Sequence, residues 1–169
     1  MTWFSARTVA WSHVPVSPEP IWRVLTDPST LAALTPLVRS IEPDGEHWRW
    51  TLHGIDGLGI RAQTAFTEQM DFIDGRRIAF TPAPPPGAAE RAAIDGVYTL
   101  EATTDGGCRV AIDLTARVDL PLPGLARRSV EALMGATMRS TGDRFATNLY
   151  EHLGLDPADA KVERGDTAR

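Results

Sequence analysis

A long helical pattern runs from Leu125 to His152, near the carboxyl end of the chain. Pro121-Leu122-Pro123-Gly124 precedes it and Gly154 and Pro157 follow it, and a glycine just past a helix with a proline beyond it is the usual signal of a helix end. The pattern predicts a helix of about eight turns. One side of its helical wheel carries an apolar stripe with one threonine in it, which comprises Val130, Leu133, Met134, Met138, Thr141, Phe145 and Leu149.

This helix is predicted to lie on something apolar, and two features distinguish it from a plain core helix. The opposite side of the wheel is expected to face solvent and carries Arg128, Arg139, Asp143 and Tyr150. Thr137 and Thr141 dilute the apolar stripe. Gly135 and Gly142 lie on its flank, and each costs roughly 1 kcal/mol of helix stability relative to alanine. A helix with these residues would let another backbone or a ligand come close.

The composition is that of an ordinary globular protein and excludes several functional classes. With 169 residues, of which 43% are hydrophobic, a single domain with a sizeable core is expected over residues 1–153. The formal net charge is -5 and basic residues form only pairs such as Arg76-Arg77, which argues against nucleic acid as a partner. No apolar run reaches the roughly 18 residues of a membrane span, and Met1 begins no signal-peptide pattern, so a cytoplasmic protein is expected.

The sequence predicts no metal, nucleotide or other cofactor. The histidines are scattered and lack a cysteine or paired carboxylates at the spacing of metal ligands; they are His13, His47, His53 and His152. Cys108, the single cysteine, lies in a strand pattern, where a buried thiol is expected rather than a nucleophile.

The amino-terminal part predicts one strand followed by two short helices. The strand is expected over residues 3–14, where apolar side chains alternate. Ser17-Pro18-Glu19 then begins a helix with a capping serine, a proline at the first helical position and an acid in the first turn. Pro28 divides the following apolar pattern into two helices, and Pro36 ends the pair.

Hairpin-connected strands occupy the middle of the chain. Turn signals such as Asp44-Gly45 and Asp74-Gly75 separate six strand patterns, at residues 37–43, 46–53, 60–72, 77–81, 94–102 and 109–120. A proline-rich loop at 82–89 interrupts the series. Residues 154–169 are polar and are expected to form a disordered tail.

This order of elements predicts an α+β protein in which a curved antiparallel sheet wraps around the long carboxyl-terminal helix, with two short helices after the first strand. Together with the stretch from Val14 to Trp22 (VPVSPEPIW), Leu25-Thr26-Asp27 and Pro36, the order resembles the START-related helix-grip superfamily, also called SRPBCC. That superfamily includes polyketide cyclases and lipid-transfer domains. The resemblance covers residues 3–153 and implies a cavity between sheet and helix. Because the superfamily hosts binding proteins as well as enzymes, function has to be argued from the site.

Alternation along the strands predicts which residues line such a cavity. The expected lining is aromatic and aliphatic, its polar members are hydroxyl groups, and the strands add no carboxylate, histidine or lysine. Glu68, Asp95 and Arg117 are expected at the surface. The candidate ligand-binding residues are Trp48, Trp50, Thr64, Phe66, Phe80 and Tyr98 from the strands and Met134, Met138, Thr141 and Phe145 from the helix. The two tryptophans also fit a plain core role.

Catalytic groups are scarce. Tyr98 could donate a proton, whereas His53 and Arg61 point outward by alternation and would reach the cavity only through a bulge. We therefore expect the protein to bind a small, mainly hydrophobic molecule, such as a lipid or an aromatic polyketide-like compound. Two alternatives stay open: a polyketide aromatase/cyclase or dehydratase acting by pocket-directed ring closure, and an interaction module whose cavity is filled by side chains. A buried ionisable group in the pocket would favour the enzyme. Ligand identity and oligomeric state stay open.

Overall fold

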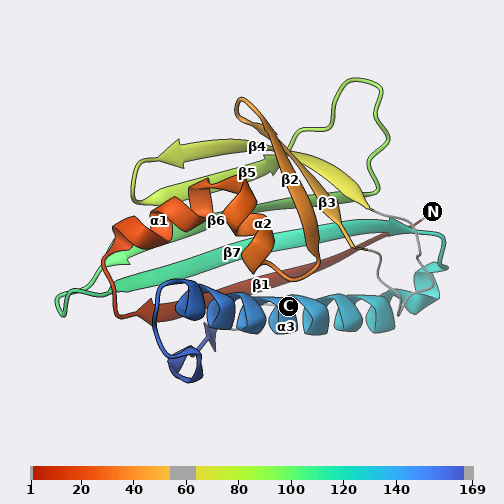
Figure 1. The fold of residues 1–169 in the computed structure, drawn as a ribbon. Coiled ribbons are helices and arrows are strands. Elements are labelled where there is room, and N and C mark those ends of the chain that lie inside the picture. Colours follow the sequence, from red (N-terminus) through yellow and green to blue (C-terminus); the bar gives the residue numbers. More distant parts are fainter. Residues whose placement is uncertain (1, 54–63, 166–169) are drawn as a thin grey trace.

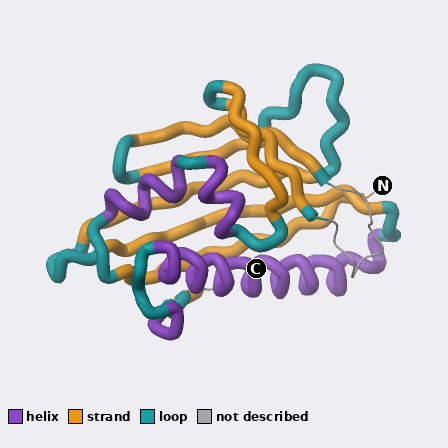
Figure 2. Tube along the Cα trace, in the orientation of Figure 1, coloured by secondary structure: helices purple, strands orange, loops and turns teal. Residues whose placement is uncertain are grey.

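A computed structural model describes residues 2–53 and 64–165 of the chain, and its main feature is one antiparallel sheet of eight strands with a long helix across it (Figure 1). The strand order is β2-β3-β4-β5-β6-β7-β1-β8. Strands β2 to β7 therefore follow one another as neighbours, and the first strand returns beside the last of them. Helices α1, α2 and α3 lie on the same face of the sheet (Figure 2).

The elements have the order that the sequence predicts. The strands are β1 (Thr2–Val14), β2 (Val38–Asp44), β3 (His47–Leu52), β4 (Ala65–Ile73), β5 (Arg77–Pro82), β6 (Ala92–Ala102), β7 (Cys108–Leu120) and β8 (Glu163–Arg164). The helices are α1 (Pro18–Thr26), α2 (Pro28–Leu34) and α3 (Arg127–His152), with 3₁₀ turns η2 (Gly124–Ala126) and η3 (Pro157–Asp159). The α+β helix-grip prediction is confirmed. Residues 60–63 of the third predicted strand lie outside the described residues.

Proline and aspartate set the bounds of the first two helices. Pro18 begins α1, although the side chain of Ser17 at the cap position makes no hydrogen bond to the helix, contrary to the predicted cap. Asp27 ends α1 and also caps α2, because its carboxylate accepts a hydrogen bond from the backbone N–H of Thr30 at 3.3 Å. Pro28, at the first position of α2, cannot continue the first helix. The break turns the buried sides of both helices toward the sheet.

Two separate clusters of buried side chains hold α3 on the sheet. The larger cluster joins Leu149 and Tyr150, near the end of α3, to α1, α2 and the strands. The smaller cluster joins Val130, near its beginning, to Phe4 of β1 and Leu120 of β7. The helix is therefore fixed at both ends.

The helical wheel predicts Tyr150 on the solvent side of α3, but the structure buries it. Its side chain is 3% exposed, and its hydroxyl donates a hydrogen bond to the backbone oxygen of His13 at 2.7 Å. The prediction failed because the chain after α3 folds back over this side of the helix, where Leu155 and Ala160 pack against the same cluster. A wheel takes account of one helix alone and misses such a covering segment.

The segment that follows α3 is ordered up to Gly165, which corrects the prediction of a disordered tail for these residues. Strand β8 pairs with β1, and the Trp11 indole N–H donates to the Glu163 carboxylate at 2.9 Å. The Arg164 guanidinium donates to the Asp143 carboxylate at 2.7 Å and to the backbone oxygen of Arg139 at 3.1 Å. Polar composition suggested disorder, but here the polar side chains themselves bind the segment to β1 and α3.

Candidate functional site

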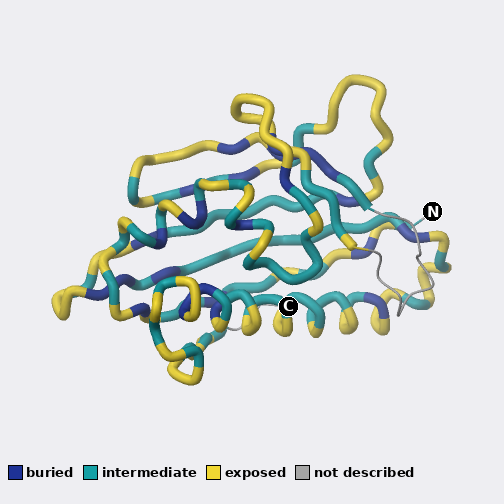
Figure 3. Tube along the Cα trace, viewed as in Figure 1, coloured by how far each residue is buried: buried dark blue, intermediate teal, exposed yellow. Residues whose placement is uncertain are grey.

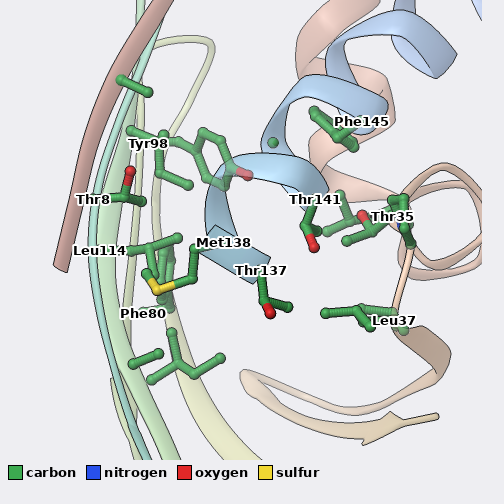
Figure 4. Close-up of a pocket in the computed structure, with 18 of the residues that line it drawn as sticks. Thr8, Thr35, Leu37, Phe80, Tyr98, Leu114, Thr137, Met138, Thr141 and Phe145 are labelled. Carbon is green, nitrogen blue, oxygen red and sulfur yellow. Dashed lines mark hydrogen bonds between the residues drawn. The ribbon is translucent and has the colours of Figure 1, made fainter. Parts of the chain in front are cut away.

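A cavity of about 320 Å³ lies between the sheet and α3. Figure 4 shows its two sides: Thr137, Met138 and Thr141 reach in from α3, and Phe80, Tyr98 and Leu114 face them from the strands. Thr35 and Leu37 close a third side from the connection between α2 and β2. Ligand pockets begin at roughly 300 Å³. The space is therefore large enough for a small molecule.

The middle of α3 leaves this space open because its side chains do not fill the gap to the sheet. Between the two clusters that fix the ends of the helix, the inward positions are Met134, Thr137, Met138 and Thr141, and none of them is fully buried. The two threonines are short, and methionine side chains are flexible and adapt to irregular spaces. In Figure 3, the buried parts of α3 accordingly lie toward its two ends.

The glycines of α3 do not mark a close approach of another backbone, which was one reading of the sequence. A Cβ atom added at Gly142 would meet only the Arg164 guanidinium, at 3.9 Å. One added at Gly135 would meet only the Arg139 guanidinium, at 3.4 Å. A close approach that only glycine permits occurs in the sheet instead. At Gly96 of β6, a Cβ would lie 2.4 Å from the backbone oxygen of Asp113 on β7.

Eight of the ten predicted ligand-binding residues line the cavity. They are Trp50, Phe66, Phe80, Tyr98, Met134, Met138, Thr141 and Phe145. Trp48 does not line it: the side chain is 4% exposed in the larger core cluster, with its ring 5.7 Å from that of Phe72. Thr64 does not line it either, and its backbone oxygen accepts from the N–H of Leu52 at 2.8 Å. The binding role of the eight residues stays a prediction.

The three weak catalytic candidates, Tyr98, His53 and Arg61, have different outcomes in the structure. Tyr98 lines the cavity, and burial, with a smaller contribution from the charge of Glu68, raises the pKa of its phenol. A phenol in this state donates a hydrogen bond and does not act as a base near neutral pH. His53 is exposed and is not part of the lining. Arg61 lies outside the described residues.

Glu68 is the functional candidate that the sequence reading missed. It was expected at the surface, but its side chain is 2% exposed and lines the cavity. Strand alternation does indicate the inward position of Glu68, because residues two apart on a strand face the same way and Phe66 is predicted to face inward. The prediction of a surface position follows the charge of the residue instead. The expectation that the strands add no carboxylate to the cavity is therefore wrong. Arg117, which was also expected at the surface, lines the cavity too, and it forms a half-exposed ion pair with Asp95 at 2.6 Å.

The surroundings of Glu68 favour its neutral form. Burial raises the pKa of the carboxyl well above its ordinary value, an interaction with the Trp50 indole N–H lowers it, and the Asp95 carboxylate raises it further. The indole Nε1 is itself buried and makes no hydrogen bond of ordinary geometry among the described residues. A carboxyl whose neutral form is favoured and an indole N–H donor therefore lie close together in a mainly apolar wall.

A second hollow, of about 300 Å³, adjoins the cavity between the α2–β2 connection and α3. It shares Pro36, Leu37, Thr137 and Thr141 with the cavity, and Arg144 lies at its rim. Leu37 adopts a φ of 72°, which is strained for a residue other than glycine.

Two predictions about special chemistry can be compared with the described residues. Within the ranges 2–53 and 64–165, no group of three or more His, Cys, Asp or Glu side chains is arranged to hold a metal ion. Cys108 is fully buried in β7, as predicted, and burial raises the pKa of its thiol. Nor is any helix of this described part long and apolar enough to span a membrane.

Similar solved structures share the fold at low sequence identity. A conserved protein from Geobacillus kaustophilus is 15% identical, covers 93% of this chain and 99% of its own, and superposes with a TM-score of 0.67. A START superfamily protein from Mycobacterium smegmatis is 14% identical, with coverages of 88% and 97% and a TM-score of 0.64. The Zhui aromatase/cyclase from Streptomyces sp. R1128 is 16% identical, with coverages of 89% and 94% and a TM-score of 0.62.

The family is established by the sequence rather than by these structures. No curated protein matches the chain. The family model described as "Polyketide cyclase / dehydrase and lipid transport" matches residues 5–153, which include the three α-helices, strands β2 to β7 and most of β1. The resemblance to the SRPBCC superfamily is thereby confirmed, and the chain belongs to the polyketide cyclase / dehydrase and lipid transport family.

Proposed function

We propose that the protein binds a small, mainly hydrophobic molecule in the cavity between the sheet and α3. The observation that carries the proposal is the cavity itself, about 320 Å³ in volume and lined chiefly by apolar side chains. Close-packed protein interiors hold few voids larger than a water molecule, because each costs stability. A space of this size argues against the interaction module with a filled core and supports a bound ligand.

The chemical class of the ligand follows from the lining. The wall is formed mainly by aliphatic, aromatic and methionine side chains, with hydroxyls at Thr137 and Thr141. A lipid or an aromatic polyketide-like compound fits such a wall, and both classes occur in the description of the family. Nucleic acid is not expected as a partner, and a cytoplasmic location stays a prediction.

Native mass spectrometry of the protein purified from its own host tests the binding proposal. We expect a complex heavier than the chain by one small molecule, which is released in organic solvent. The matched variants are Thr141→Trp, which fills the cavity, and Thr147→Trp, which adds the same side chain at an exposed position of the same helix. The first should lose the extra mass and the second should keep it. Retention by both variants would contradict a site in this cavity.

The second candidate function is a polyketide aromatase/cyclase or dehydratase, and Glu68 is the observation that favours it. A buried carboxyl with a raised pKa can deliver a proton to a carbonyl or hydroxyl of the substrate and recover it later, while the cavity positions the chain for ring closure. Tyr98 would hold an oxygen of the substrate as a donor.

A poly-β-ketone surrogate distinguishes the two candidates. If the protein is an enzyme, the parent forms an aromatic product detectable by its ultraviolet absorbance. Glu68→Gln should then reduce kcat while leaving surrogate binding in place, because glutamine keeps the size of the side chain but delivers no proton. Binding without turnover in the parent would leave the binding function alone.

A further inference from the structure

Two polar groups of the cavity wall lie close together, and their mutual contact does not satisfy them. The Trp50 Nε1 is buried and makes no hydrogen bond of ordinary geometry in the described residues, although the indole lies near enough to the Glu68 carboxyl to lower its pKa. None of the ion pairs in the described part of the chain involves Glu68, although its side chain is only 2% exposed. Buried polar groups in folded proteins are almost always hydrogen-bonded, so each exception calls for an explanation. A group of the ligand that reaches both residues would supply the missing partner.

The backbone register puts these groups on one patch of the wall. On the antiparallel strands β3 and β4, Trp48 pairs with Glu68 and Trp50 pairs with Phe66. Trp50 and Glu68 are therefore diagonal neighbours on the same face, close enough for long side chains to meet one group between them. Both line the cavity.

Aromatic packing fixes the direction of the indole N–H. The Trp50 ring stacks on Phe66 with centroids 6.1 Å apart and an interplanar angle of 5°, and it lies 6.4 Å from the ring of Trp48. A donor held by two rings needs no rearrangement when a ligand arrives, which favours binding. The N–H is thus a fixed donor that lies near the Glu68 carboxyl and makes no hydrogen bond of ordinary geometry with it.

The chemistry of Trp50 and Glu68 restricts which group of a ligand can bind to both residues. An amine or ammonium group only donates, so it would leave the Trp50 N–H unsatisfied. A carboxylate would accept from Trp50 but would bury a second acid next to Glu68, and Arg117, the cation of β7 that lines the cavity, is already paired with Asp95 at 2.6 Å. An uncharged carbonyl oxygen has two lone pairs and accepts from the indole N–H and from a protonated carboxyl together.

We propose that Trp50 and Glu68 together bind an uncharged carbonyl oxygen of the ligand. The ligand is then a neutral apolar ketone or a related carbonyl compound. A hydrocarbon, an amine, or a fatty acid with its anionic head group at this place does not fit the pair. The inference rests on the proposed function, since it requires a ligand in the cavity. It adds where the polar atom of that ligand lies and which two residues select it.

Binding of 2-acetylnaphthalene and 2-ethylnaphthalene to the purified protein, measured by calorimetry, tests the inference. The two probes have nearly the same size and differ in the carbonyl oxygen. Two hydrogen bonds of ordinary net strength correspond to a preference of about tenfold or more for the ketone. We expect this preference in the parent and in Glu68→Gln, whose amide still donates a hydrogen bond.

Variants without the donor should lose the preference. Trp50→Phe removes the N–H and keeps an aromatic ring, and Glu68→Leu removes the carboxyl at similar volume; each should bind the two probes more equally than the parent does. The carbonyl stretch of bound, ¹³C-labelled 2-acetylnaphthalene should move to lower frequency in the parent and in Glu68→Gln, and less in Glu68→Leu. If one variant fails to fold, as judged by circular dichroism, the other still gives the comparison.

The outcomes that overturn the inference differ from those that overturn the function. Equal binding of the two naphthalenes by the parent would defeat the carbonyl site and leave the binding function intact. Tighter binding of 2-(2-naphthyl)ethylamine than of the ketone would show that Glu68 selects a cation instead. Absence of binding by any of the three probes would defeat the proposed function, and the inference with it.

Discussion

The ends of α3 and its middle face the same sheet but behave differently. At the ends, Val130 and Leu149 are 4% and 3% exposed and belong to buried clusters. In the middle, Thr137, Met138 and Thr141 are only partly buried and look into the cavity. The same helical period produces both regions, so periodicity shows which side of a helix turns inward but not whether anything touches it. The sizes of the facing side chains, together with the distance between helix and sheet, decide that.

A pair of truncations on α3 gives the largest effect. Leu149→Ala should lower the free energy of unfolding by about 2 to 5 kcal/mol, because it leaves a void in a packed cluster. Met138→Ala should cost less than about 1.5 kcal/mol, because it only enlarges a space that already exists. Urea denaturation of the ligand-free variants measures both. Equal losses would show that the middle of the helix is packed as tightly as its end.

The second-largest effect is expected on the sheet side of the cavity, in the pH dependence of stability that Glu68 causes. Its pKa is raised in the folded protein by burial first and then by Asp95, so folding favours the protonated form. Its stabilisation is fully present below the pKa in the unfolded chain, about 4.3, and is lost as the pH rises through the folded-state pKa.

Glu68→Gln, which cannot ionise, should therefore melt at a higher temperature than the parent at neutral pH, and its melting temperature should depend less on pH. Thermal unfolding between pH 4 and pH 8 measures this; Glu151→Gln, at an exposed position of α3, serves as the control. A parent protein that gains stability over this range relative to Glu68→Gln would contradict a buried, neutral Glu68.

Tyr150→Phe tests the packed end through a single hydrogen bond. The variant keeps the ring and removes the hydroxyl that donates to the backbone oxygen of His13 at 2.7 Å. We expect a loss of about 1 kcal/mol in the free energy of unfolding. A loss within error would mean that water replaces the hydroxyl and that this end of the helix is more open than the structure shows.

Thr141→Trp should have the smallest effect on stability. In a packed core the added atoms would cost about 1 to 3 kcal/mol. In the cavity they fill space, so the change in unfolding free energy should stay below about 1 kcal/mol, while uptake of a hydrophobic fluorescent dye is lost. Thr147→Trp is the matched control and should keep dye uptake. Normal dye uptake by Thr141→Trp would show that the cavity does not extend to this position.

Much of the site could be predicted because strand alternation is a local rule. Phe66, Phe80 and Tyr98 were placed inward by alternation alone, and all three line the cavity. Trp48 follows the same rule, yet Phe72 and the core cover it, because α1 and α2 fill that end of the concave face. Glu68 was misplaced because the usual preference of a charged residue for water was allowed to override its position on the strand.

The sequence by itself determined the elements, their order and the side of each that turns inward, because helix caps, turns and periodicity act between residues near each other in the chain. Only the tertiary structure decided where the interior stays empty, that Tyr150 is covered by the segment after α3, and that Glu68 and Trp50 are diagonal neighbours on the adjacent strands β3 and β4. These features depend on which distant segments meet and how far apart their backbones lie. No local pattern records those distances.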